Sequence, residues 1–97
     1  MRTPDKWVVL KIGEIYKVFA NWSGGYLDGD SWRLNSGILE VKDAGDAWEF
    51  IGYSGSIYHC RKNGYGCNSY GAAVLSGWGG VEVMDEETDW GNLLKKS

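Results

Sequence analysis

The residues best suited to chemistry gather in one segment, Tyr53 to Tyr70, with the sequence YSGSIYHCRKNGYGCNSY. This segment holds the single histidine of the chain, both cysteines, four tyrosines and an adjacent Arg-Lys pair. Tyrosine rings stack on flat ligands, the cations attract anions, and serine hydroxyls and glycine N–H groups form short hydrogen bonds. The segment therefore predicts a site for a small anionic, nucleotide-like ligand. The predicted ligand-binding residues are Tyr53, Ser54, Ser56, Tyr58, His59, Arg61, Lys62 and Tyr65. The competing interpretation is that the tyrosines belong to the core and that the cations are solvated in a turn.

The geometry of this segment depends on Asn63-Gly64, a dipeptide that favours a type I′ β-hairpin. In such a hairpin Cys60 faces Cys67, in a hydrogen-bonded pair with Cα atoms about 5.5 Å apart. We expect two reduced thiols that lie close together. A structural disulfide is the alternative that this distance permits.

The same residues argue against a metal site and against catalysis. His59, Cys60 and Cys67 supply at most three ligands, and adjacent residues of a strand point to opposite faces. That geometry also separates His59 from Cys60 as a base and nucleophile, and no pair of carboxylates lies in an apolar setting. We therefore expect a protein without enzyme activity, metal or cofactor.

A second group of residues is suited to contacts with another protein. Aromatic residues lie beside glycines around residues 22–26 and 77–80, and five carboxylates fall between Glu82 and Asp89. Exposed rings and an acidic surface are typical of docking on a basic partner. The predicted partner-binding residues are Trp22, Tyr26, Trp78, Asp85, Glu86 and Glu87. The competing interpretation of the carboxylates is a solvated loop that leads into a helix.

Short strands must position these groups. Lys6 to Ile12 is rich in β-branched residues, and in Ile15 to Trp22 the apolar residues recur at every second position, which predicts a half-buried strand. Asp28-Gly29 predicts a hairpin, and Asp43 to Asp46 predicts another between strands at Ile38–Lys42 and Trp48–Tyr53. Strands interrupted this often predict a mainly β fold, a small antiparallel barrel-like or sandwich domain.

Two short helices are expected near the C-terminus. Asn68 to Leu75 begins with an N-cap at Asn68 or Ser69, although Gly71 lowers its helix propensity. Thr88 to Lys96 places three apolar residues on one helical face, after a run of acids. No linker or repeat divides residues 1–97, so a single domain is expected.

Charge and composition narrow the class of protein. The net charge is −3 and the isoelectric point is about 5.0, so we expect no direct binding to nucleic acid. The sequence contains no run of 18 apolar residues, so no membrane helix is predicted. The first residues also lack the apolar core of a secretion signal. The expected location is the cytoplasm, and self-association is left open.

Three segments, SWRLNSGI (31–38), GYSGSIYHCRKNGYG (52–66) and YGAAVL (70–75), give the chain a resemblance to small accessory proteins of unknown role encoded by tailed bacteriophages. The resemblance covers most of residues 5–75 and carries over no functional residue. It implies a viral protein in the cytoplasm of a host cell, which binds and neutralises a host component, often part of a defence system. Such a protein sequesters a nucleotide-like ligand or inhibits a host protein, and a structural component of the phage is the third option.

Overall fold

The computed structural model describes residues 1–24 and 29–95, with the side chains of residues 93–95 left aside. Tyr26, a predicted contact residue, and Asp28, the first residue of the predicted Asp28-Gly29 turn, lie outside this description. The elements are β1 (Lys6–Ile12), β2 (Ile15–Trp22), β3 (Ser31–Leu34), β4 (Ile38–Asp43), β5 (Ala47–Gly52), β6 (Ile57–Arg61), the 3₁₀ turn η1 (Lys62–Gly64), α2 (Ser69–Ser76), β7 (Val81–Val83) and α3 (Trp90–Lys95).

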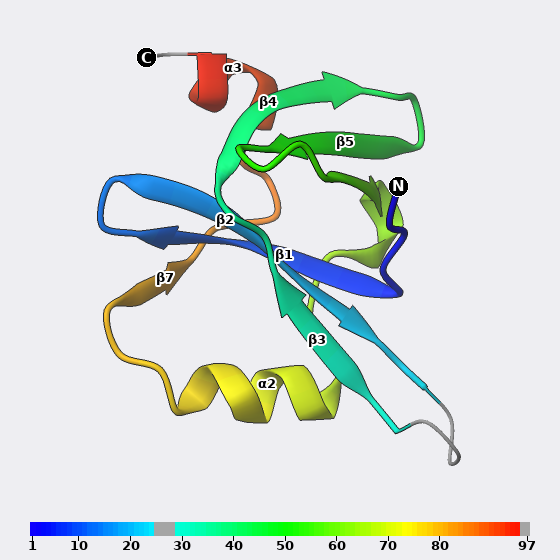
Figure 1. The fold of residues 1–97 in the computed structure, drawn as a ribbon, viewed down its shortest axis with the longest axis vertical. Coiled ribbons are helices and arrows are strands. Elements are labelled where there is room, and N and C mark those ends of the chain that lie inside the picture. Colours follow the sequence, from blue (N-terminus) through cyan, green and yellow to red (C-terminus); the bar gives the residue numbers. More distant parts are fainter. Residues whose placement is uncertain (25–28, 96–97) are drawn as a thin grey trace.

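The described strands form two antiparallel sheets, with the orders β3-β2-β1-β7 and β4-β5-β6 (Figure 1). The prediction of a mainly β, antiparallel fold is confirmed. The sheets do not close on each other, so the barrel-like form of that prediction is wrong. Each sheet keeps its own hydrogen-bonded ladder, and the chain changes sheet between β3 and β4.

The change of sheet depends on Asn35 and Gly37. The side-chain Oδ1 of buried Asn35 accepts hydrogen bonds from the backbone N–H groups of Val18 (2.9 Å) and Gly37 (3.2 Å). Gly37 has a φ of 131°, a conformation that residues with a Cβ rarely adopt. This bend allows one continuous stretch of chain to serve both sheets.

The main core lies between the two sheets. Because side chains alternate along a strand, one face of β1 and β2 meets the inner face of the second sheet. The buried residues of this core are Trp7, Val9, Val18, Ala20, Ile38, Phe50, Tyr58, Cys60 and Trp90. Trp90 comes from α3, so the helix at the end of the described chain completes the core.

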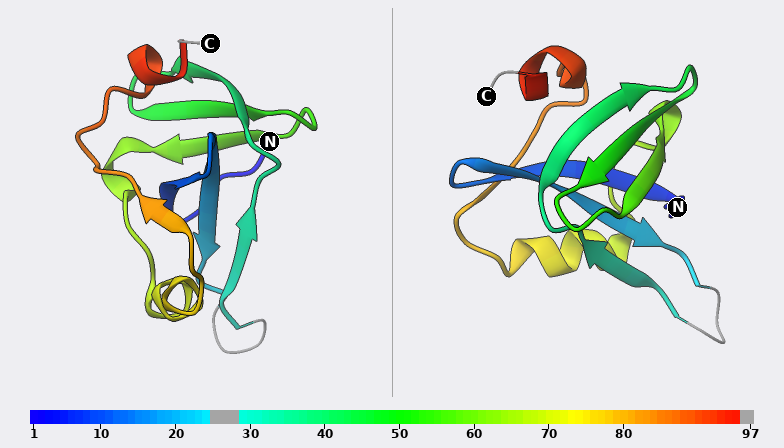
Figure 2. Two further views of the ribbon diagram at one scale, coloured as in Figure 1. Left: turned by 90° about the vertical axis from the view of Figure 1, so that its left-hand side faces the viewer. Right: turned by 45° about the horizontal axis from the view of Figure 1, so that its top comes forward.

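Helix α2 covers the other face of the first sheet (Figures 1 and 2). Val74 and Leu75 of α2 pack with Trp78 against a second cluster of buried residues, Val8, Leu10 and Phe19. The second half of β2, from Val18 to Asn21, is therefore buried on both faces, with Phe19 and Asn21 at 0% exposed. The expectation of a half-buried strand is wrong for this half, because the layer formed by α2 is not visible in the sequence pattern of β2 itself.

The predicted N-cap of α2 is confirmed, and Gly71 has a structural reason to be there. The side chain of Asn68 accepts a hydrogen bond from the Gly71 N–H at 2.7 Å. A Cβ on Gly71 would lie 2.0 Å from Oδ1 of Asn21, which in turn accepts the N–H of Asn68 at 3.1 Å. Glycine is required at this point because helix and strand approach closely.

The other helix and turn predictions have mixed outcomes. The hairpin at Asp43–Asp46 is confirmed, with strands at Ile38–Asp43 and Ala47–Gly52 and a φ of 88° at Gly45. The helix predicted at 88–96 is present as Trp90–Lys95, where Oδ1 of Asp89 accepts the N–H of Asn92. Of the two helices, α2 precedes β7, so the pair is not confined to the C-terminal end.

The segment before β1 ties the two sheets together. Arg2 exchanges backbone hydrogen bonds with β6, through Ile57 O (2.9 Å) and His59 N (2.7 Å). Asp5 N donates to Asn21 O of β2 at 3.0 Å. Residues 2–5 therefore form an inter-sheet clasp.

None of the helices in the described part of the chain is both long and apolar enough to cross a membrane.

Candidate functional site

The predicted hairpin at Asn63-Gly64 is wrong. These residues lie in the 3₁₀ turn η1, and neither has the positive φ that a type I′ turn requires. After this turn the chain returns along the start of β1 instead of along β6. Trp7 Nε1 donates to Arg61 O at 2.7 Å, and Gly66 N donates to Trp7 O at 2.8 Å. The contacts of Trp7 override the local turn preference.

Cys60 and Cys67 consequently do not face each other. Cys60 lies in the core between the sheets, whereas Cys67 packs in the cluster beneath α2. Both are free thiols, as expected, but the expectation that they lie close together fails with the hairpin. Burial raises the pKa of both thiols, and that of Cys60 far above its usual range. Neither cysteine is activated as a nucleophile.

Strand β6 separates the predicted site residues by its alternation. Tyr58 and Cys60 point into the core. Tyr58 is 2% exposed, so it is a core residue, as the competing interpretation of the tyrosines states. His59 and Arg61 are on the outer face, where His59 is half-buried. The prediction that His59 and Cys60 point to opposite faces is confirmed.

Each cationic or basic group of the predicted anion site meets a carboxylate of the protein itself. Lys62 Nζ lies 2.8 Å from Asp43 Oδ1, and this hydrogen bond lowers the pKa of Asp43. His59 Nδ1 lies 3.2 Å from Glu49 Oε2. These contacts reduce the attraction that either residue would have for an external anion.

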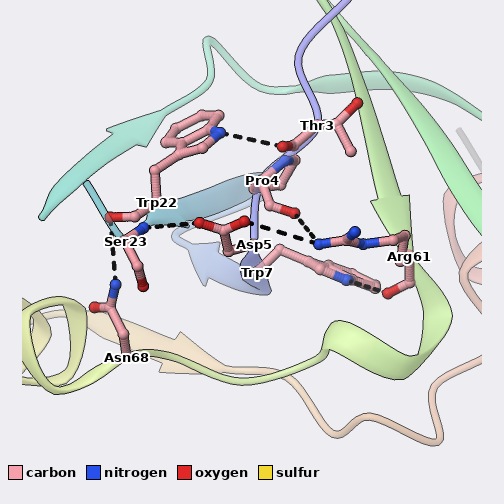
Figure 3. Close-up of polar contacts among 8 residues, drawn as sticks. All are labelled: Thr3, Pro4, Asp5, Trp7, Trp22, Ser23, Arg61 and Asn68. Atoms are coloured by element: carbon pink, nitrogen blue, oxygen red, sulfur yellow. Dashed lines mark hydrogen bonds and ion pairs between the residues drawn. The ribbon is translucent and has the colours of Figure 1, made fainter. Parts of the chain in front are cut away.

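Arg61 is held by the inter-sheet clasp (Figure 3). Its Nη2 donates to Pro4 O at 3.4 Å and lies 3.9 Å from Asp5 Oδ1. The other carboxylate oxygen of Asp5 accepts the N–H of Ser23 at 2.8 Å, which connects β6 to the end of β2. Arg61 therefore has a structural role at this junction.

Three predicted ligand-binding residues gather at a different place, beside the change of sheet. The Tyr53 ring is 60% exposed and packs over Gly37, where a Cβ would lie 2.7 Å from the ring. Ser54 hydrogen-bonds Ser36 through its N–H at 3.0 Å and also contacts the Ser56 hydroxyl at 3.3 Å. These side chains form a separate surface from that of Lys62 and Tyr65.

Lys62 and Tyr65 do share a pocket, of about 250 Å³. The residues that complete its lining are Trp7, Trp48, Glu86, Glu87, Thr88 and Trp90. It combines aromatic walls with two exposed carboxylates, and we call it the Trp48 pocket. None of its three tryptophans was predicted as a site residue, since positions 7, 48 and 90 come from distant parts of the chain with no spacing that relates them.

Tyr65 fixes one side of the Trp48 pocket. Its hydroxyl donates to Met84 O and accepts the N–H of Val9 at 3.3 Å, which ties the acidic segment to β1. The ring meets Trp7 edge-on, with centroids 4.7 Å apart. Burial raises the pKa of Tyr65 to about 12. Tyr65 thus remains neutral and holds residue 84 in place near neutral pH.

The predicted partner-binding residues divide into buried and exposed groups. Trp22 is half-buried and donates through Nε1 to Thr3 O at 3.1 Å. Trp78, for which the flanking glycines suggested exposure, is half-buried because it packs edge-on against Phe19 and Trp32. Asp85, Glu86 and Glu87 are exposed, as both the docking surface and the solvated-loop interpretation of the acidic run require.

Within the described residues, no group of three or more His, Cys, Asp and Glu side chains is arranged to hold a metal ion. No protein-family model, curated protein or solved structure matches the chain.

The buried thiol and phenol predict a loss of stability at alkaline pH. The pKa of Tyr65 rises from 10.0 to about 12 on folding, and that of Cys60 rises from 9.0. The unfolded chain releases these protons first, so their stabilisation is complete below about pH 9 and falls as the pH rises toward 12. We expect the urea midpoint to fall over this range, and Tyr65→Phe to flatten its upper part. An unchanged midpoint between pH 8 and 11.5 would contradict the burial of both groups.

Proposed function

We propose that the protein is a non-catalytic binding protein that docks on another protein through the Trp48 pocket and the adjacent acidic residues Asp85, Glu86 and Glu87. One contrast carries the proposal. The basic groups expected to hold an anion are paired with the protein's own carboxylates, whereas these three acidic residues are exposed beside an aromatic pocket. None of the ion pairs found among the described residues includes any of the three.

Electrostatic complementarity explains how such a surface would select its partner. Exposed carboxylates steer a basic surface into contact and discriminate against acidic ones. Half-buried rings such as Trp48 and Tyr65 supply contact area, with little conformational entropy lost on binding. The partner is therefore a protein with a basic patch.

The resemblance to phage accessory proteins suggests the biological setting of this docking. It supports a viral protein in the host cytoplasm that inhibits a host protein, such as a component of a defence system. A non-catalytic role is supported by the burial of Cys60 and by the contact between His59 and Glu49.

Sequestration of a small anionic ligand is the second candidate. It is favoured by a separate pocket of about 230 Å³ lined by Asp46, Arg61, Lys62 and Asn63, where both predicted cations line one cavity. The carboxylate of Asp46 and the ion pairs of Arg61 and Lys62 weaken the case.

Charge reversal tests the proposed function. The double variant Glu86→Lys, Glu87→Lys is expected to reduce the amount of host protein that co-purifies from host cells by about tenfold or more, because two attractive charges become repulsive. The matched control is Glu14→Lys, Glu40→Lys, which makes the same charge change at exposed positions outside the pocket. Quantitative mass spectrometry of the co-purified proteins provides the measurement.

Two outcomes would overturn the docking proposal. One is an equal loss of the partner in the acidic-surface variant and in the control, since the effect would then follow net charge alone. The other is a nucleotide-like mass bound to the native protein and lost in Arg61→Ala, which would establish the second candidate.

A further inference from the structure

The Trp48 pocket already shows how it treats a positive charge. Lys62 places its ammonium 4.5 Å from the centroid of the Trp48 ring, within the range of a cation–π contact. The same ammonium is hydrogen-bonded to Asp43 at 2.8 Å, so a carboxylate compensates its charge. The aromatic wall of the pocket thus accepts a cation within the protein's own structure.

Two further carboxylates line this pocket without a basic partner among the described ion pairs. They belong to Glu86 and Glu87, both exposed. The segment that carries them is set by the Tyr65–Met84 hydrogen bond and by the N–H of Glu87, which donates to Asp85 Oδ1 at 2.7 Å. Aromatic faces and carboxylates together suit a cationic group that carries an apolar stem.

The size of the pocket limits what can enter it. Its volume of about 250 Å³ lies below the roughly 300–1,000 Å³ of typical small-molecule sites. Trp7 and Trp90 line it and are each 1% exposed, while the half-buried Trp48 and Tyr65 keep surface that a ligand can contact. A single side chain fits these dimensions better than a nucleotide does.

We propose that the Trp48 pocket receives one arginine or lysine side chain from the partner protein. This inference rests on the proposed function and adds the chemistry of its central contact. The cationic head lies beside Glu86 and Glu87, and its methylene stem packs against Trp48 and Tyr65. Lys62 acts as an internal competitor for the face of Trp48.

A pair of short peptides tests the proposal without knowledge of the partner. The probes are blocked Gly-Arg-Gly and blocked Gly-citrulline-Gly, whose side chains have nearly the same shape but differ in charge. Binding is followed by NMR through the indole N–H resonance of Trp48. We expect a saturable shift with the arginine peptide, and binding at least about tenfold weaker with the citrulline peptide.

Protein variants supply the second arm. Glu86→Gln, Glu87→Gln is expected to weaken the arginine peptide several-fold, and Lys62→Met to strengthen it several-fold by freeing the Trp48 ring. Glu14→Gln, Glu40→Gln is the matched control and should leave binding unchanged. Melting temperatures of the variants establish that each one remains folded at the temperature of the titration.

The outcomes separate this inference from the proposed function. Equal binding of both peptides, or weaker binding in Lys62→Met, would overturn the side-chain site, even if charge reversal still abolished docking on the host protein. Conversely, selective binding of the arginine peptide supports the site, even if the co-purified partner proves insensitive to Glu86 and Glu87 and the docking proposal falls.

Discussion

Gly71→Ala is expected to destabilise the protein by about 3 kcal/mol or more, a large share of the ~5–15 kcal/mol stability of a typical domain. The added Cβ would lie 2.0 Å from Oδ1 of Asn21 and 2.7 Å from its Cγ. Asn21 is 0% exposed in β2 and cannot move aside without disturbing the start of α2, where it accepts the Asn68 N–H. Urea denaturation followed by circular dichroism measures the change.

Two comparisons make this prediction specific to the close approach. Gly91→Ala, a glycine-to-alanine change in α3, meets only Asp89 Oδ1 at 3.7 Å and is expected to be neutral or stabilising by up to about 1 kcal/mol. In the double variant Gly71→Ala, Asn21→Ala the clash is gone. The double variant should therefore lose less stability than the sum of the losses in the two single variants. Full additivity would contradict direct contact between the two residues.

Trp90→Ala is expected to cost about 3–5 kcal/mol, the range for removal of a large ring from a core. Trp90 is 1% exposed. The centroid of its ring lies 6.4 Å from the ring centroids of Trp7 and Phe50 and 6.2 Å from the ring centroid of Tyr65. Its loss would remove one wall of the Trp48 pocket and weaken the packing of α3 against β4. The free energy of unfolding by urea provides the measurement.

Trp90→Phe serves as the conservative comparison, because it keeps an apolar ring at the same place. We expect it to recover more than half of the stability lost in the alanine variant. If Trp90→Ala instead changes the free energy of unfolding by less than about 1 kcal/mol, α3 is an appendage and not part of the core.

The sequence predicts the strands of this fold better than it predicts their layers. The period of two in β1 and β2 is visible because each strand alternates between two surroundings. The second covering layer is not visible, because Asn21 looks like a solvent-facing residue until Asn68 and Gly71 are placed against it. Burial of a polar side chain becomes predictable once its hydrogen-bonding partner is known.

Local turn chemistry succeeds where nothing competes with it. The turn at Asp43–Asp46 lies in solvent, so Asp43 Oδ1 and the φ of Gly45 decide its course. At Asn63-Gly64 the indole of Trp7 and the backbone of Asp5 lie against Gly64, and these tertiary contacts decide instead. The local preference of Asn-Gly for a hairpin turn is weaker than the stabilisation gained by burying the Trp7 side chain, so the tertiary contacts decide the backbone conformation.

The candidate site was predictable in its charges but not in its walls. Glu86 and Glu87 stand out in the sequence as part of an acidic run. Trp48 and Trp90 contribute to the same pocket through pairing of β5 with β6 and packing of α3, and no short motif encodes either contact. The polar and aromatic residues at 53–70 do not form one site. They lie in three separate places: beside the change of sheet, in the core between the sheets, and around the Trp48 pocket and the clasp.

The packing of Trp7 against Trp90 has a consequence for synthesis on the ribosome. The chain emerges in order, so Trp7 in the first strand must wait for Trp90, which is translated 83 residues later. A nascent chain arrested before residue 90 would expose Trp7 and Phe50 to chaperones and proteases. Force-sensitive arrest measurements should record the final folding step only after the segment bearing Trp90 has cleared the exit tunnel.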